Sequence, residues 1–172
     1  AYLRLIANTD DDTAFARVVN FPTRGIGGRS SEALQEAARQ SNCSLYNAAA
    51  SLAGKPGSAV ARFIAMIESL RAETRDLPLP EVIDQLIERS GLRQHYLADK
   101  EGQDRLENLD ELINAASSFL KDDGVPLVDG DEVVPDGGPL ASFLAHASLE
   151  AGEHQAGEGQ DAIQLMTVHA AK

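Results

Sequence analysis

Residues 58–75, SAVARFIAMIESLRAETR, decide the fold class, because their apolar side chains recur at helical spacing. Steps of three and four residues separate these side chains, which places them on one face of an α-helix. Alanine and leucine are plentiful in the chain, and both lose little conformational freedom in a helix. The stretch therefore predicts an amphipathic helix that buries one face in a core. That face is formed by Val60, Phe63, Ile64, Ile67 and Leu70.

Helical patterns continue on both sides of this stretch. Upstream, Ser30 or Ser31 is expected to cap a helix, and the glycines within 54–57 are expected to end the helix over about 44–53. Downstream, Pro80 is expected to start a helix that Gly91 ends. The predicted helices cover residues 2–7, about 10–19, about 30–40, about 44–53, 58–75, 80–90, about 106–120 and about 140–147.

The remaining segments lack helical spacing. Residues 122–138 are acidic, rich in glycine and proline and aperiodic, which predicts a mobile loop, and residues 152–160 predict a polar connector. Residues 163–168 are the only good strand candidate. The expected fold class is therefore mostly α, with seven or eight helices and one lone strand near the C-terminus.

A lone strand leaves its own backbone hydrogen bonds unmade. We therefore expect residues 163–168 to join a sheet of a longer protein, or to form a dimer by strand exchange. The chain begins inside an apolar helical pattern and ends directly after this strand. Natural termini are usually polar and frayed, so we interpret both ends as cuts in a longer protein.

Charge is distributed unevenly along the 172 residues. The net charge is −12, which taken alone argues against a nucleic-acid surface. Residues 121–160 hold nine acids against one base and so account for −8 of it. By contrast, residues 13–31 hold Arg17, Arg24 and Arg29 and no acid. The chain-wide balance therefore hides a locally basic patch.

A turn inside this patch, residues 23–27, suits a phosphate group. The sequence Thr-Arg-Gly-Ile-Gly lies between two predicted helices, which resembles a helix-hairpin-helix element. Glycines let the backbone approach a ligand closely, and free amides at the next helix start attract anions. Arg24 or Arg29 would add a charged contact. Such binding reads the backbone and not the base sequence. A plain tight turn between helices is the alternative, because a lone Gly-x-Gly is a weak signal.

Other chemistry finds little support in the sequence. There is no Gly-x-x-x-x-Gly-Lys-[Ser/Thr] phosphate loop, and Asp131-Glu132 lies in a glycine-rich acidic stretch where solvated charge is the better reading. The histidines lack metal-ligand spacing, and the single Cys43 excludes an internal disulfide. No signal peptide or membrane-spanning run occurs. We expect a cytoplasmic protein that has no membrane contact and binds neither ATP nor metal.

Several segments together resemble one family. LMTVHAAK at 165–172 is similar to the start of motif V of superfamily 1 helicases of the UvrD, Rep and PcrA type. AYLRLIAN at 1–8, followed by DDTAFARVVNFPTRGIG at 11–27, resembles the entry to that family's helical accessory subdomain, called 2B. RLENLDELI at 105–113 and FLAHASLEAG at 143–152 match further landmarks in the family's order. The chain thus looks like an internal piece of such a DNA helicase.

This resemblance covers residues 1–120 and 139–172 and implies a division into domains. Residues 1–9 and 161–172 would belong to a RecA-like α/β core domain, called 2A. The 2B subdomain would be inserted between them, over about residues 10–160. In the parent protein, ATP and Mg²⁺ would drive movement along single-stranded DNA in the 3′→5′ sense. The fragment lacks the motifs for this and is expected to be inactive, with no cofactor of its own.

The resemblance also implies site residues. One group matches the motif that touches duplex phosphates ahead of the fork, and another matches positions of motif V near the single strand. Arg29 joins the first group from its position in the basic patch. The implied residues are Thr23, Arg24, Gly25, Ile26, Gly27 and Arg29 for the duplex, and Thr167 and His169 for the single strand.

Two functions remain open at this point. The chain is expected to bind a duplex/single-strand DNA junction and to regulate an ATP-dependent helicase in DNA repair or replication. The alternative is a protein-interaction module, in which the acidic residues 121–160 and the helices recruit DNA-repair proteins or restrain the parent helicase core. Reversing the charge of Arg24 and Arg29 would harm only the first function. A free-standing helical enzyme has little support, because no nucleophile–base pair is evident.

Overall fold

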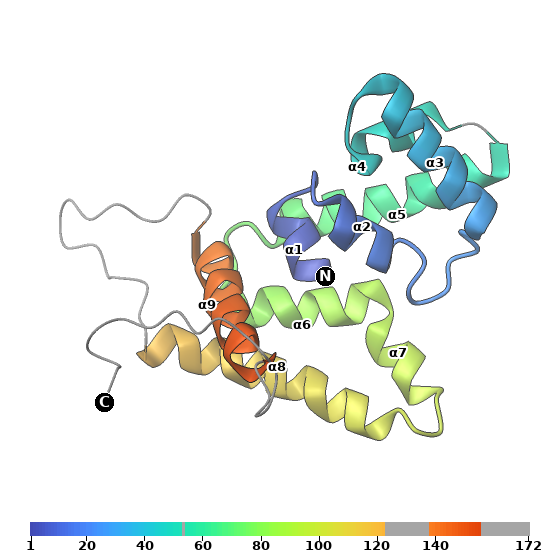
Figure 1. Cartoon of the computed structure of the whole chain (residues 1–172). Helices are drawn as coiled ribbons and strands as arrows, with labels where there is room; N and C mark the ends of the chain where they lie inside the picture. The colour runs from blue at the N-terminus through green and yellow to red at the C-terminus, as the bar shows by residue number, and fades with distance from the viewer. Residues whose placement is uncertain (53, 123–137, 156–172) are drawn as a thin grey trace, which may run out of the picture.

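The computed structural model describes residues 1–52, 54–122 and 138–155 (Figure 1). Within these ranges the chain forms nine α-helices and one short 3-10 helix, and no strand. The predicted mostly α fold class is therefore confirmed for this part of the chain. The elements are α1 (Tyr2–Ala7), α2 (Asp12–Val18), α3 (Gly28–Ser41), α4 (Leu45–Ala48), η1 (Ala49–Ser51), α5 (Gly54–Glu73), α6 (Leu79–Ser90), α7 (Leu92–Leu97), α8 (Gln103–Asp122) and α9 (Gly138–Gln155).

Some predictions concern residues outside the described ranges. The interior of the predicted loop, residues 123–137, and the predicted strand 163–168 with its strand-exchange dimer lie there, so both stay predictions. The predicted connector from residue 152 is wrong at its start, because α9 continues to Gln155. No helix in the described ranges is long and apolar enough to cross a membrane.

The apolar stripe of α5 forms the centre of the core, as its spacing predicted. Val60, Phe63, Ile67 and Leu70 are almost completely buried, and Ile64 is half-buried. Phe15 of α2 meets the ring of Phe63 edge-to-face, with ring centroids 5.6 Å apart. Burying a large apolar side chain of this kind stabilises the fold by about 1.5–3 kcal/mol. The stripe therefore supplies much of the driving force for folding.

The start of α5 differs from the prediction. Residues 54–57 were expected to end the preceding helix and to leave the next one to start at residue 58, but α5 already begins at Gly54 and runs through Gly57. A Cβ atom on Gly57 would lie 2.2 Å from the carbonyl oxygen of Leu52. Glycine at this position therefore permits the close approach of two backbone segments and does not break the helix.

Two further helix boundaries correct the prediction. Neither Ser30 nor Ser31 caps α3, because that helix begins two residues earlier and its N-cap is Gly27. Gly91 ends α6 in the left-handed conformation with φ +80°, as expected, but the short helix α7 starts directly after it. Helix α7 was not predicted, because its six residues show too little periodicity to identify.

Helix α1 lies in the middle of the body, between α2 to α5 on one side and α6 to α9 on the other (Figure 1). It packs against α2, α5, α6 and α9. Leu5 is completely buried, and Tyr2 and Ile6 are nearly so. The assignment of residues 1–9 to a separate core domain stays a prediction, while the packing joins α1 to the same hydrophobic core as the other helices.

Polar and aromatic contacts hold helices α6 to α9 together. Arg93 of α7 forms ion pairs with Glu88 and Asp84 of α6, the latter at 3.6 Å, and with Asp110 of α8 at 3.3 Å. Exposed ion pairs are each worth little, but several partners around one guanidinium fix the angle between helices. On the other side of α8, the rings of Phe119 and Phe143 join it to α9, with centroids 5.5 Å apart.

Two buried tyrosines make the fold sensitive to alkaline pH. Burial, with help from a hydrogen bond to Glu68, raises the pKa of Tyr46 above its usual value of 10.0, and burial likewise raises the pKa of Tyr2. The unfolded chain releases these phenolic protons near pH 10, whereas the folded chain keeps them. The stabilisation is therefore complete below that pH and is lost as the pH rises through the folded-state pKa values.

We expect the free energy of unfolding to fall as the pH rises above about 10. In Tyr46→Phe this fall should be clearly smaller, because one of the two raised phenols is gone. Urea titrations at about pH 8 and about pH 10.5 measure the difference. An equally steep fall in Tyr46→Phe and in the unsubstituted chain would contradict the raised pKa of Tyr46 as a cause of this pH dependence.

Candidate nucleic-acid interface

The turn between α2 and α3 is shaped from inside by one asparagine. Asn20 accepts two backbone hydrogen bonds on its side-chain oxygen, from the N–H of Arg24 at 2.8 Å and from the N–H of Ile26 at 3.0 Å. The side chain of Ile26 is 2% exposed and anchors the turn in the core. Gly25 has φ +75°, a conformation that favours glycine. The sequence thus fixes a defined loop and not a flexible link.

The outer side of this turn presents unoccupied donors. In the described part of the chain, the backbone N–H groups of Gly25, Gly27, Gly28 and Arg29 make no hydrogen bond. All four residues are exposed, and so is Thr23. A Cβ atom added to Gly27 or Gly28 would meet no protein atom within 4 Å, so nothing crowds the side-chain positions of these two residues. The amides lie at the start of the 14-residue helix α3, where the helix dipole favours an anion.

Arg24 points inward, unlike the other residues of the turn. Its guanidinium donates from Nη1 to the carbonyl oxygens of Val18 at 3.1 Å and Pro22 at 3.0 Å. From Nη2 it donates to the hydroxyl of Tyr2 and to the carbonyl oxygen of Ser90, both at 2.7 Å. The expected phosphate contact from this side chain does not fit the geometry, because its four terminal N–H groups already have partners.

Two other arginines near the turn are available to a ligand. Arg29 at the start of α3 and Arg17 in α2 are exposed, and neither forms an ion pair within the described ranges. Arg4, by contrast, is paired with Asp11 at 2.7 Å. The acids closest in sequence to Arg29 are Glu32 and Glu36 of α3, so the basic surface is confined to the turn and the first residues of the helix.

A shallow hollow of about 400 Å³ adjoins the turn on the side of α7. Its lining includes Thr23 from the turn and Gln94 and His95 from α7. His95 stacks edge-to-face on the half-exposed ring of Phe21, with centroids 5.0 Å apart. Sequence reasoning treated His95 as an ordinary surface or packed histidine, since nothing in the sequence brings α7 next to the turn.

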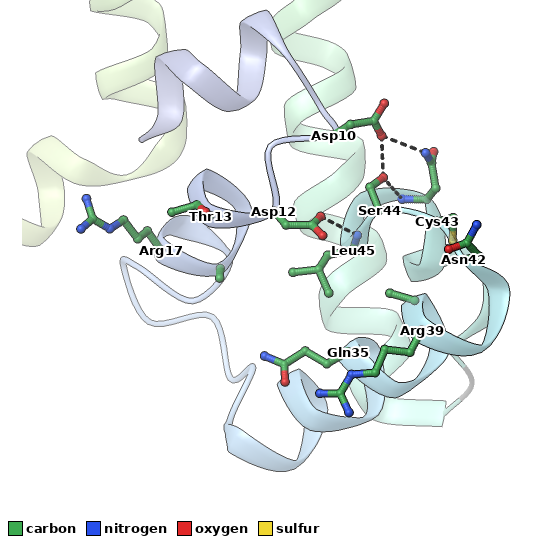
Figure 2. A pocket seen from close by; sticks show the side chains of 13 residues that line it. Asp10, Asp12, Thr13, Arg17, Gln35, Arg39, Asn42, Cys43, Ser44 and Leu45 are labelled. Carbon is green, nitrogen blue, oxygen red and sulfur yellow. Dashed lines mark hydrogen bonds between the residues drawn. The ribbon is translucent and has the colours of Figure 1, made fainter. Parts of the chain in front are cut away.

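A groove between α2, α3 and α4 has a volume of about 1170 Å³ (Figure 2). Its two carboxylates already hold the protein together. Asp10 accepts from the hydroxyl of Ser44 at 2.6 Å, and Asp12 accepts from the backbone N–H of Leu45 at 2.8 Å. Arg17 points away from both acids (Figure 2). The acids of the groove thus hold the start of α2 against the start of α4.

No residues that would hold a metal or a nucleotide come together in the described ranges. No group of three or more histidine, cysteine or acidic side chains is placed to bind a metal ion. The sequence contains no phosphate loop. Within the described ranges, no cluster of acidic side chains is therefore placed to hold the Mg²⁺ that a helicase motor requires. The exposed turn is the remaining candidate for function.

A comparison with known protein families decides the parentage of the chain. The family described as UvrD-like helicase C-terminal domain matches residues 1–172, which is the whole sequence. The chain belongs to this family. This match and the helicase relatives confirm the predicted UvrD-type parentage of the chain.

Individual members of the UvrD-like family support the same conclusion. The chain is 46% identical over 180 residues to DNA helicase II of Escherichia coli K12, and the match covers 100% of the chain and 24% of that protein. It is 42% identical over 180 residues to DNA helicase II of Haemophilus influenzae, with 100% and 24% covered. It is 36% identical over 181 residues to the ATP-dependent DNA helicase PcrA of Leuconostoc citreum, with 100% and 23% covered. The chain thus spans about a quarter of each of these UvrD-like helicases.

The two site residues implied by motif V of the UvrD-like family, Thr167 and His169, lie outside the described residues. Their contact with single-stranded DNA stays a prediction. Of the duplex residues, Thr23, Gly25 and Gly27 lie together on the exposed side of the turn with Arg29 beside them, while Arg24 and Ile26 face inward. The structure thus divides the predicted set into a surface that faces solvent and a support behind it.

Proposed function

We propose that this chain is the 2B accessory subdomain of a UvrD-type, ATP-dependent 3′→5′ DNA helicase that acts in DNA repair or replication. Its role would be to hold duplex DNA at a duplex/single-strand junction and to regulate unwinding by the parent core. Membership of the UvrD-like family supports the parentage. ATP and Mg²⁺ would bind elsewhere in the parent protein, so the chain by itself is expected to be catalytically inactive.

The observation that carries the duplex-binding role is the row of bare amides. Gly25, Gly27, Gly28 and Arg29 each offer a backbone N–H without a partner in the described part of the chain. A phosphate oxygen satisfies such donors well, because its charge also interacts favourably with the dipole of α3. The glycines leave no side chain between the backbone and the ligand. A sugar-phosphate strand fits this surface at any base sequence.

Charged and hydroxyl groups around the amides would extend the contact. Arg29 starts α3 directly beside the glycines, and Arg17 lies on α2, which leads into the turn. Thr23 adds an exposed hydroxyl on the other side of the glycines. Because the chain carries a net charge of −12, a duplex would be held at this restricted basic site and repelled by the chain as a whole elsewhere. We propose that this restriction sets where the duplex sits relative to the motor.

Salt dependence provides the test of duplex binding. If about three phosphates are neutralised, the affinity of the chain for a hairpin duplex with a 3′ single-stranded tail should fall about 40-fold between about 50 and 200 mM salt. Fluorescence anisotropy with a labelled hairpin measures the affinity. Absence of binding at low salt, or binding that is indifferent to salt, would sink the proposal.

A charge reversal separates duplex binding from the protein-interaction alternative. Arg29→Glu should weaken duplex binding by roughly tenfold and lower the slope of log affinity against log salt by about one, because one phosphate contact is lost. The matched control is Arg75→Glu, which changes the net charge equally. Arg75 lies in the link between α5 and α6, far from the turn in Figure 1, and is exposed without an ion pair in the described ranges.

The outcome of this comparison is decisive between the two functions. Equal weakening by Arg29→Glu and Arg75→Glu would mean that only the overall charge matters and that the turn is not the contact. Unchanged duplex binding in Arg29→Glu, with capture of the parent helicase core or of a DNA-repair protein intact, would favour the interaction module.

A further inference from the structure

The side chain of Arg24 joins four separate parts of the fold behind the duplex-binding turn. Its hydrogen bonds reach the end of α2 at Val18, the turn at Pro22, the end of α6 at Ser90 and the first helix, α1, at Tyr2. The guanidinium also lies over the rings of Phe63 and Tyr2, at 5.3 and 5.8 Å from their centroids. A charged group held by this many partners defines one geometry, because any displacement breaks several contacts together.

Tyr2 completes this network from the side of α1. Its hydroxyl accepts the hydrogen bond from Arg24 and donates to the carbonyl oxygen of Phe21, one residue before Pro22. The side chain of Tyr2 is 6% exposed, so water does not replace these bonds. A single phenol thus connects the first helix to both the backbone and the arginine of the turn.

The backbone of Arg24 carries the connection to the outer side of the turn. Its N–H shares the side-chain oxygen of Asn20 with the N–H of Ile26. The unoccupied amides of Gly25 and Gly27 lie on either side of Ile26. The path from Tyr2 to the open amides therefore consists of direct hydrogen bonds and one short stretch of backbone.

We infer that Tyr2 and Arg24 are positioning residues for duplex binding and that they couple the packing of α1 to the shape of the turn. This inference rests on the proposed duplex-binding function. Coupling is reciprocal, so a duplex bound at the turn strengthens the packing of α1, and a displaced α1 weakens the grip on the duplex. The first helix of the chain thereby acts on DNA affinity without touching DNA.

The chain offers matched controls for both residues. Tyr46 is a second buried tyrosine, 8% exposed, whose hydroxyl donates to Glu68 and is remote from the turn in sequence and in contacts. Arg71 is a second half-buried arginine that donates to α1, at the carbonyl oxygen of Ile6, at 3.2 Å. Neither residue contacts the turn, so their variants report the general effect of losing a buried hydroxyl or an arginine bound to α1.

The first experiment measures duplex affinity of the whole chain with the labelled hairpin, well below the melting temperature. Tyr2→Phe should bind about fivefold more weakly, a typical strength for coupling through a small network, while Tyr46→Phe binds as the parent chain does. Arg24→Gln should weaken binding further, and Arg71→Gln, which removes a hydrogen bond to α1 but none to the turn, should weaken it less than Arg24→Gln does. The double variant Tyr2→Phe/Arg24→Gln should lose less affinity than the two single losses combined, because Tyr2 and Arg24 belong to one hydrogen-bond network.

The second experiment does not require DNA. In amide NMR spectra of the free chain, Tyr2→Phe should shift the signals of Gly25, Gly27 and Gly28, and Tyr46→Phe should leave them in place. Unshifted glycine signals in Tyr2→Phe, or additive losses of affinity in the double variant, would overturn the coupling. If the unsubstituted chain binds no duplex while Tyr2→Phe still shifts the glycine signals, the proposed function is overturned. The coupling between Tyr2 and the turn within the fold would then stand.

Discussion

Replacing both Gly27 and Gly28 by alanine should weaken duplex binding by at least about tenfold while the fold stays intact, because the methyl groups occupy the space that a phosphate needs. Neither glycine has a positive φ, and a Cβ atom at either position meets no protein atom within 4 Å. Alanine suits position 28, in the first turn of α3, better than glycine does. Gly27 is the N-cap, where alanine is less favourable than glycine by up to about 1 kcal/mol, which offsets that gain. The double alanine substitution should therefore leave the fold stable and lower the affinity for the duplex.

Two measurements separate these effects. The melting temperature of Gly27→Ala/Gly28→Ala should remain within a few degrees of that of the parent chain, while anisotropy with the hairpin shows the loss of affinity. Ala147→Val, which adds methyl groups on the exposed side of α9 at the other end of the body, serves as the control. Undiminished binding by the double alanine variant would show that DNA does not approach these amides.

Phe63→Ala should destabilise the fold by about 3–5 kcal/mol, the largest effect on stability expected for a single residue here. The ring is 1% exposed and packs edge-to-face on Phe15. It also lies beneath the guanidinium of Arg24, so its removal leaves a cavity and takes away the apolar support of a buried charge. A domain of ordinary stability would retain only a small margin after this loss.

Urea titration followed by circular dichroism measures this loss. Leu149→Ala removes an apolar side chain that is 73% exposed and should change the free energy of unfolding by no more than about 0.5 kcal/mol. A loss below about 1 kcal/mol in Phe63→Ala would mean that the core around α5 is not packed as described. Duplex affinity measured under folding conditions should also fall, since the support of the turn is disturbed.

Helices whose apolar residues recur over several turns could be predicted from the sequence, because the pattern itself specifies which face is buried. The stripe of α5 and the positive-φ stop at Gly91 belong to this class. Gly57 was misjudged, since its close approach to Leu52 is a tertiary contact that composition does not reveal. Helix α7 was missed because six residues are too few to establish a period.

At the candidate site, the sequence identified the turn but not the orientation of its arginines. Arg24 and Arg29 look equivalent in the sequence, yet one is held inside the fold and the other is exposed. The difference arises from Tyr2 and Ser90, which lie 22 and 66 residues away from Arg24 in the chain. Contacts at such separations follow from how the helices pack and cannot be deduced from local spacing.

The cluster around Arg93 has a consequence for the path of DNA. One guanidinium is surrounded there by the carboxylates of Asp84, Glu88 and Asp110, so this corner of α6, α7 and α8 carries an excess of two negative charges. If DNA binds at the neighbouring turn as proposed, that corner would repel it over roughly a Debye length, about 10 Å in ordinary buffer. The direction in which the double helix leaves the protein would then depend on repulsion by these carboxylates as much as on the glycines. At low salt this repulsion is stronger, so the duplex would adopt a narrower range of directions.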